Sequence, residues 1–247
     1  MRIATWNIGG GFIHSGDETK FDVEDLNYFI SELKKLKPDL VSLQEALFVE
    51  NEQNQVVELG KTLSFPHVAY RVHSASHLKQ GTSIALGILS KFPIISTEYL
   101  QLTNPLMEVT RPNGEVWLSQ DKGFLQVTLK INGQPMRVLC GHNFPYHHFK
   151  RDFMHEEFNN IRGEIESIFL NSRFPTIVAA DMNYDDLRKA IPNVFSNGFV
   201  DVFNEPTIPK GVQQDHVIVS EHCTVNDYKI VKGKADHYLC YVDLELK

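Results

Sequence analysis

Short apolar runs, each bounded by turn-forming or polar residues, recur along the whole chain. A run of this length with such boundaries predicts a buried β-strand. The runs occupy residues 3–6, 40–43, 83–89, 136–140, 176–180, 217–219 and 239–244. In residues 125–131 apolar and polar side chains alternate instead, which predicts a strand with one exposed face. Asn132-Gly133 follows, and this dipeptide predicts a hairpin turn into the run at 136–140.

Two other segments carry apolar residues at helical spacing. Asp22 as N-cap and Pro38 as the stop frame the first, which contains Leu26, Phe29, Ile30, Leu33 and Leu36. The second has the clearest amphipathic pattern in the chain and contains Met154, Phe158, Ile161, Ile165 and Ile168. Helices are therefore expected at both of these segments.

The order of the predicted elements indicates the fold class. Strands outnumber helices, and the hairpin at residues 132–133 makes two neighbouring strands antiparallel. This mixture disfavours a purely parallel, doubly wound sheet and favours an α/β fold of two mixed sheets packed face to face with helices outside. The chain shows no internal repeat, linker or charge block, so we expect one domain over residues 1–247.

Composition narrows the class of protein. The 247 residues are 42% hydrophobic and 22% charged, which is typical of a globular protein, and no apolar run reaches the span of about 18 residues that a membrane helix needs. The residues after Met1 lack the pattern of a secretory signal. Three widely spaced cysteines, Cys140, Cys223 and Cys240, are expected to be reduced, so we expect a cytoplasmic protein.

The net charge limits how the protein could hold a nucleic acid. With 24 Lys and Arg against 31 Asp and Glu, the formal charge is −7. Bulk attraction to phosphate therefore cannot hold a nucleic acid strand. Any such contact needs a local basic patch or a bound cation.

Polar side chains follow the predicted strands at the points where the strands end. They are Asn7, Glu45, His142-Asn143, Asp181-Met182-Asn183 and Asp236-His237. Any one of them alone is better explained as a turn or cap residue. Together they supply carboxylates, amides and imidazoles, which are the groups needed to bind a hard divalent cation and to transfer protons at a phosphoryl group.

These strand ends carry the motifs of a known family. In chain order they read Thr5-Trp6-Asn7, Leu43-Gln44-Glu45, Gly141-His142-Asn143, Asp181-Met182-Asn183, Asp215-His216 and Asp236-His237. The ordered set resembles the endonuclease/exonuclease/phosphatase superfamily, and the resemblance covers nearly the whole chain. The turn Ser90-Lys91-Phe92-Pro93 is similar to the family's pattern as well. The resemblance implies a four-layer α/β sandwich and a metal-dependent phosphoester hydrolase.

The resemblance also implies a role for each site residue. Glu45 would be the main ligand of Mg²⁺, for which Mn²⁺ can substitute, with Asn7 and Asp236 beside it. Asp181 would orient or deprotonate the attacking water, and Asn183 would hold the phosphate and that water.

Three further residues have implied roles. His237 would contact the scissile phosphate, oriented or charged by Asp236. His142 would lie across the site, near the phosphate or the leaving oxygen. Asp215 would orient a catalytic histidine or support the metal ligands; its assignment is weakened by Gln213-Gln214, where the family often has Arg or Lys.

Three functional hypotheses remain open at this stage. The preferred one is a monomeric phosphodiesterase acting on nucleic acid, such as a nuclease or a DNA-end-processing enzyme, without stable membrane association. The second is a lipid or small-molecule phosphoesterase similar to sphingomyelinases, with an apolar hairpin at residues 100–107 or 116–118. The third is a catalytically silent binding module, which the complete residue set disfavours.

Other local patterns have simpler explanations. A zinc site of His142, His147, His148 and His155 is disfavoured by its irregular spacing, and no cysteine joins the set. The run Gly9-Gly10-Gly11 lacks phosphate-loop spacing, so a flexible loop at the edge of the site is expected.

Overall fold

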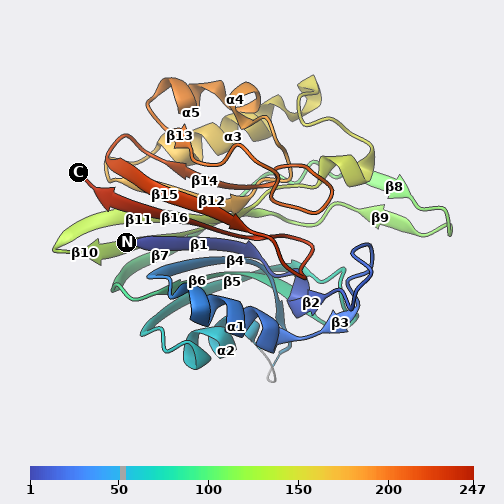
Figure 1. The fold of residues 1–247 in the computed structure, drawn as a ribbon. Helices are drawn as coiled ribbons and strands as arrows, with labels where there is room; N and C mark the ends of the chain where they lie inside the picture. The colour runs from blue at the N-terminus through green and yellow to red at the C-terminus, as the bar shows by residue number, and fades with distance from the viewer. Residues whose placement is uncertain (51–53) are drawn as a thin grey trace.

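Two six-stranded mixed β-sheets pack face to face, and helices cover the outer face of each (Figure 1). The computed structural model describes residues 1–50 and 54–247. The four layers are helices, sheet, sheet and helices, which is the α/β sandwich predicted from the sequence. Among the described residues, no helix has both the length and the apolar character that crossing a membrane requires.

The first sheet has the strand order β15-β16-β1-β4-β6-β5. Its strands are β1 (Arg2–Asn7), β4 (Leu40–Phe48), β5 (His67–Ala75), β6 (Ser83–Ser90), β15 (Cys223–Val231) and β16 (Leu239–Leu246). Strand β1 is central and runs parallel to β4 and antiparallel to β16. Helices α1 (Leu26–Leu36) and α2 (Gln55–Thr62) cover this sheet.

The second sheet has the order β13-β14-β12-β11-β10-β7. Its strands are β7 (Ile94–Gln101), β10 (Gly123–Ile131), β11 (Gln134–His142), β12 (Thr176–Asp181), β13 (Val200–Asp201) and β14 (Asp215–Val219). The parallel pair β11 and β12 lies at its centre. The covering helices are α3 (Asn159–Leu170), α4 (Leu187–Ala190) and α5 (Pro192–Ser196).

Short elements lie around the end of the sandwich where β1 finishes. They are the strand pairs β2 (Phe12–Ile13) with β3 (Val23–Glu24) and β8 (Glu108–Thr110) with β9 (Val116–Leu118), and the 3₁₀ helices η1 (Gly9–Gly11), η2 (Tyr146–Phe149) and η3 (Glu156–Phe158). The β8–β9 hairpin extends beyond the two sheets (Figure 1). The expected flexible glycine loop is instead η1, in which all three glycines are buried with positive φ angles.

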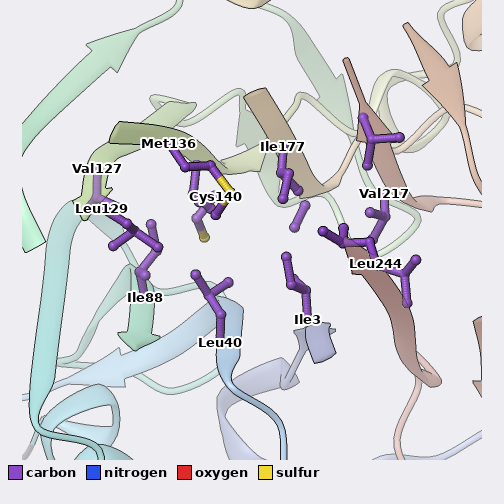
Figure 2. Packing of buried hydrophobic residues seen from close by; sticks show 14 of the residues in the cluster. Ile3, Leu40, Ile88, Val127, Leu129, Met136, Cys140, Ile177, Val217 and Leu244 are labelled. Carbon is purple, nitrogen blue, oxygen red and sulfur yellow. The ribbon is translucent and has the colours of Figure 1, made fainter. Parts of the chain in front are cut away.

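The core between the sheets is apolar and close-packed. Figure 2 shows Ile3 and Leu40 of one sheet pointing toward Ile177 and Val217 of the other. Near the end of β1 the core becomes polar: the Ser42 hydroxyl donates a hydrogen bond to the carbonyl oxygen of Ala179 at 2.6 Å. This bond crosses between β4 and β12 and fixes the two strands whose ends carry Glu45 and Asp181.

The hairpin and the first helix follow the sequence prediction closely. Asn132 and Gly133 have φ angles of 51° and 84° and connect β10 to β11, as the Asn-Gly dipeptide predicts. Helix α1 ends at Leu36, just before Pro38. Its N-cap is Asp25, whose side chain accepts a hydrogen bond from the Tyr28 amide, so the prediction of Asp22 as the cap was wrong.

Two other predictions need correction. Strand β10 was expected to have one exposed face over residues 125–131, and Lys130 is exposed and Gln126 half-buried as expected, but Thr128 between them is buried at 8% exposure. The predicted helix from Met154 begins only at Asn159, after η3. The Asp152 side chain accepts a hydrogen bond from the Met154 amide and holds it in a turn before the helix.

Candidate active site

Four central strands meet at one cleft of about 1110 Å³. Strands β1, β11 and β12 end there and β4 passes it at Glu45, so side chains far apart in the sequence come together. The predicted site residues that line the cleft are Asn7, Glu45, His142, Asp181, Asn183, Asp236 and His237. Asp215 is fully buried behind this surface and reaches the cleft through His237.

The backbone is bent where β4 presents Glu45. The pairing of β4 with β6 shifts register between Leu43 and Ala46, and Glu45 has a φ angle of 54°. A left-handed conformation is unfavourable for a residue with a Cβ atom and is often found at functional sites. The bulge turns the Glu45 carboxylate toward the cleft, where the residue is 8% exposed.

Asp181 is the most enclosed carboxylate of the cleft. Its Oδ2 accepts a hydrogen bond from Asn7 Nδ2 at 2.9 Å, and its Oδ1 accepts one from the Asn183 amide at 2.9 Å. Burial raises the pKa of Asp181 to about 6. The Asn7 Oδ1 in turn accepts a hydrogen bond from the Gly9 amide at 3.0 Å, so the Asn7 amide group is fixed in orientation.

His237 lies between two carboxylates. Its Nδ1 is 2.8 Å from Asp215 Oδ2, and its Nε2 is 3.8 Å from Asp181 Oδ2. Although burial opposes it, the negative charges of Asp215 and Asp181 raise the pKa of His237 well above its ordinary value. His237 therefore carries a proton near neutral pH.

The partner of His237 corrects one sequence prediction. Asp236 was expected to orient or charge His237, but the ring is oriented by a hydrogen bond that its Nδ1 donates to Asp215, the role that the sequence left open for Asp215. Asp236 contributes only its negative charge to the raised pKa of His237.

Lys122 is a site residue that the sequence analysis missed. It precedes β10, is 4% exposed and lines the cleft. Its Nζ lies 3.0 Å from Nδ1 and 3.2 Å from Nε2 of His142. Burial lowers the pKa of Lys122 to about 8, and burial together with the charge of Lys122 lowers the pKa of His142 well below its ordinary value. His142 is therefore a neutral imidazole with a single N–H.

The Nε2 atom of His142 also lies near two carboxylates. It is 3.5 Å from Asp181 Oδ2 and 3.7 Å from Glu45 Oε1. The ammonium of Lys122 is close to both ring nitrogens and does not distinguish the two tautomers. The carboxylates are near Nε2 alone, and they favour the N–H at that atom.

The site residues fit a divalent cation. Carboxylates outnumber cations here: the acids are Glu45, Asp181, Asp215 and Asp236, and the cations are Lys122 and protonated His237. The Oδ1 atoms of Asp215 and Asp236 are buried and accept no hydrogen bond from any described residue. Ligand atoms of Asp181, Asp215 and His237 lie within 4.8 Å of one another, but protonated His237 donates to Asp215 and has no lone pair for a metal ion, so the candidate ligands are carboxylates. Such oxygen-rich surroundings suit a hard cation.

Comparison with known families gives the class of protein. The model of the endonuclease/exonuclease/phosphatase family matches residues 4–237. The chain belongs to this family, whose members are divalent-metal-dependent hydrolases of phosphoester bonds.

Several solved structures share the fold over the whole chain. An endonuclease/exonuclease/phosphatase protein from Beutenbergia cavernae has a TM-score of 0.77 at 17% identity, covering 100% of this chain and 71% of that one. The human Nocturnin catalytic domain has a TM-score of 0.71 at 17% identity, covering 100% of this chain and 93% of that one. A mannosyl-6-phosphatase from Bacteroides thetaiotaomicron has a TM-score of 0.64 at 13% identity, covering 100% of both chains. No curated protein matches the chain. At these identities, the likeness establishes the fold alone.

Proposed function

We propose that the protein is a Mg²⁺-dependent phosphodiester hydrolase that cleaves a nucleic acid strand, as a nuclease or an enzyme that processes DNA ends. The observation that carries the proposal is the approach of protonated His237 to Asp181, with Nε2 3.8 Å from Oδ2, at the base of an acidic cleft. A cationic donor and a buried carboxylate this close together can contact one phosphoryl oxygen and the attacking water side by side.

Asp181 is the proposed base. Its carboxylate orients the attacking water and accepts its proton, and a pKa of about 6 leaves it ionised at neutral pH while keeping it basic. The hydrogen bonds from Asn7 and the Asn183 amide fix the carboxylate plane, so the water is held in one direction.

His237 is the proposed electrostatic partner of the phosphoryl group. Its Nε2–H donates to a non-bridging oxygen as negative charge develops there, and Asp215 keeps the ring protonated and oriented. The Nε2–H of His142, which lies 3.5 Å from the same Asp181 oxygen, is a second donor to the phosphoryl group. Asn183 completes the phosphate contacts; its own Nδ2 donates to the Asn143 carbonyl oxygen at 3.0 Å, which holds the side chain at the cleft wall.

Glu45 and Asp236 are the proposed ligands of the cation, with Asn7 beside them. Bound there, Mg²⁺ neutralises charge on the phosphoryl oxygens during hydrolysis, and Mn²⁺ is the expected substitute. Because the protein has a net charge of −7, the cation supplies local positive charge that the chain as a whole lacks.

A second candidate function is hydrolysis of a lipid or small phosphoester. Strand β9 of the projecting hairpin exposes two apolar side chains, Val116 at 52% and Leu118 at 63%, beside the cleft. A lipid substrate predicts that activity requires vesicles and falls when Val116 and Leu118 are both replaced by serine.

One panel of substrates tests these proposals together. Intact and nicked DNA, RNA, sphingomyelin vesicles and an aryl phosphodiester are incubated with the protein and Mg²⁺, with a chelator and Asp181→Ala as controls. Cleavage of DNA or RNA that both controls abolish supports the proposal. Cleavage of vesicles alone supports the second candidate. No cleavage of any substrate with Mg²⁺ or Mn²⁺ contradicts both and favours a binding module.

A further inference from the structure

Lys210 is a cation at the rim of the cleft without an acidic partner. Two other lysine or arginine side chains line the cleft within the described residues, and each contacts a neighbouring side chain. The guanidinium of Arg111 lies 3.1 Å from the Trp117 ring centroid and 3.8 Å from Glu115, and Lys122 contacts His142. Lys210 is exposed and makes no ion pair or side-chain hydrogen bond with any described residue.

The turn that carries Lys210 is fixed to the catalytic residues. The Gly211 amide donates to the Ile208 carbonyl oxygen at 3.1 Å, with Gly211 at a φ angle of 79°. Just before this turn, the hydroxyl of Thr207 accepts a hydrogen bond from the Asp215 amide at 2.9 Å. The Lys210 backbone is thereby held at a set position relative to Asp215 and its partner His237.

The carbonyl oxygen of Thr207 provides a second attachment. It accepts a hydrogen bond from the Tyr238 amide at 2.7 Å, and Tyr238 directly follows His237. The turn is thus tied both to β14 and to the segment that leads into β16. A flexible ammonium on a rigid turn can settle on an anion near the scissile phosphate without movement of the backbone.

Two histidines share this rim with Lys210. The rings of His147 and His148 are 4.2 Å apart on η2, which is anchored by Tyr146 stacked on Phe153 at 4.6 Å. Burial and the charge of Lys210 lower the pKa of His147, and the nearby charge of His237 adds to this effect. Lys210 and His237 therefore make the surroundings of His147 electropositive, which favours an anionic ligand.

We propose that Lys210, His147 and His148 form an anion subsite that binds a second phosphate of the substrate, next to the phosphate that is cleaved. Phosphate oxygens accept hydrogen bonds from the ammonium and from the imidazole N–H groups. A nucleotide chain carries a second phosphate next to the one that is cleaved, whereas a lipid with a single phosphodiester leaves the subsite empty. The inference rests on the proposed function and narrows its substrate class.

Binding of a short DNA strand tests the subsite without cleavage. A fluorescein-labelled single-stranded dT hexamer is titrated by fluorescence anisotropy with Asp181→Asn protein in Mg²⁺ at several salt concentrations. Each phosphate contact on single-stranded nucleic acid contributes about 0.7 to the slope of log K against log salt. Adding Lys210→Gln is expected to reduce the slope by about 0.7 and weaken binding about tenfold at low salt.

Matched variants separate charge from structure. Lys210→Arg should retain the slope, and Lys130→Gln, an exposed lysine at the far end of β10, should leave it unchanged. Lys210→Gln protein that binds the hexamer with the slope and affinity of its parent would overturn the proposal. Equal losses for Lys210→Gln and Lys130→Gln would overturn it too, because the effect would then be one of net charge.

A second probe keeps the subsite testable if the nucleic acid proposal fails. If the parent protein does not bind the hexamer, the substrate class is wrong. Inorganic pyrophosphate and phosphate are then compared by thermal shift in Mg²⁺. A larger shift with pyrophosphate that Lys210→Gln removes supports a subsite for a second phosphate, and equal shifts in both proteins contradict it.

Discussion

The Nδ1 atom of His237 lies 2.8 Å from Oδ2 of Asp215, and the two residues belong to different sheets. Asp215 begins β14 of the second sheet, and His237 precedes β16 of the first. The hydrogen bond therefore joins the sheets at the base of the cleft. It also fixes the opposite ring nitrogen toward Asp181, so the relative position of the sheets determines the geometry of the site.

Asp215→Asn should reduce activity while leaving the fold intact. The amide cannot supply the negative charge with which Asp215 raises the pKa of His237, so the pKa falls and the ring holds its proton less tightly. We expect kcat to fall by about 10²–10⁴-fold, the usual contribution of one acid–base group, with KM little changed. Steady-state kinetics measure this. Asp227→Asn, an exposed carboxylate on β15, serves as the control, and equal activities of the two variants would contradict the assigned role.

The sequence was sufficient to identify the strands that carry chemistry. Residues 3–6, 40–43 and 176–180 are apolar on both faces because both sheet faces are buried, so their patterns are unambiguous. Strands β5, β7 and β15 were missed. They lie at or near the sheet edges, where exposed polar residues interrupt the apolar pattern, as at Tyr70 in β5.

The partners within the site could not be read from the chain. Asp236 is next to His237 in sequence, but His237 Nδ1 donates its hydrogen bond to Asp215, which begins a strand of the second sheet. Nothing in the neighbouring sequence indicates that Lys122 is a site residue, because a single lysine before a strand is normally solvated. Only the packing of β10 against β11 brings it beside His142. Pairings across strands depend on register and sheet packing, which single-residue patterns do not encode.

Lys122→Met should raise the pKa of His142. In the wild-type protein burial and the charge of the ammonium, which lies 3.0 Å and 3.2 Å from the two ring nitrogens, lower this pKa well below its ordinary value. Methionine removes the charge but not the burial, so we expect the pKa of His142 to rise only partway toward 6.5. Long-range ¹H–¹⁵N correlation spectra of ¹⁵N-histidine-labelled protein, recorded over a range of pH, follow the protonation of the ring. Lys130→Met should leave the spectrum of His142 unchanged, whereas identical spectra of wild-type and Lys122→Met proteins would rule out the proposed influence.

Mg²⁺ should stabilise the wild-type protein through Glu45. A ligand at about 100 times its Kd adds about 2.7 kcal/mol to the free energy of unfolding, provided that it binds the folded state alone. Glu45→Gln removes the main proposed ligand charge, so the rise in Tm on adding Mg²⁺ should largely disappear. Differential scanning calorimetry with and without Mg²⁺ measures the effect. Glu58→Gln on the exposed face of α2 should respond as the wild type does. If Mg²⁺ raised the Tm of Glu45→Gln as much as that of the wild type, the metal would bind at another site.

A second buried pair gives a pH-dependent contribution to stability away from the cleft. His216 is fully buried, with Nδ1 2.7 Å from Asp201 Oδ2 and Nε2 donating to the Tyr184 carbonyl oxygen at 2.9 Å. Although burial opposes it, the negative charge of Asp201 raises the pKa of His216 above its ordinary value of 6.5. The histidine therefore binds its proton more tightly in the folded protein than in the unfolded chain.

The sign of the pH dependence follows from this raised pKa. The stabilisation is fully present below the unfolded pKa of about 6.5 and is lost as the pH rises through the folded pKa. Asp201→Asn removes the partner charge, so we expect it to lower the free energy of unfolding by about 1–3 kcal/mol near pH 6 and by less as the pH increases. Urea unfolding of both proteins between about pH 6 and 9 measures the difference. A difference that stays constant or grows with pH would show that His216 is neutral in the folded protein.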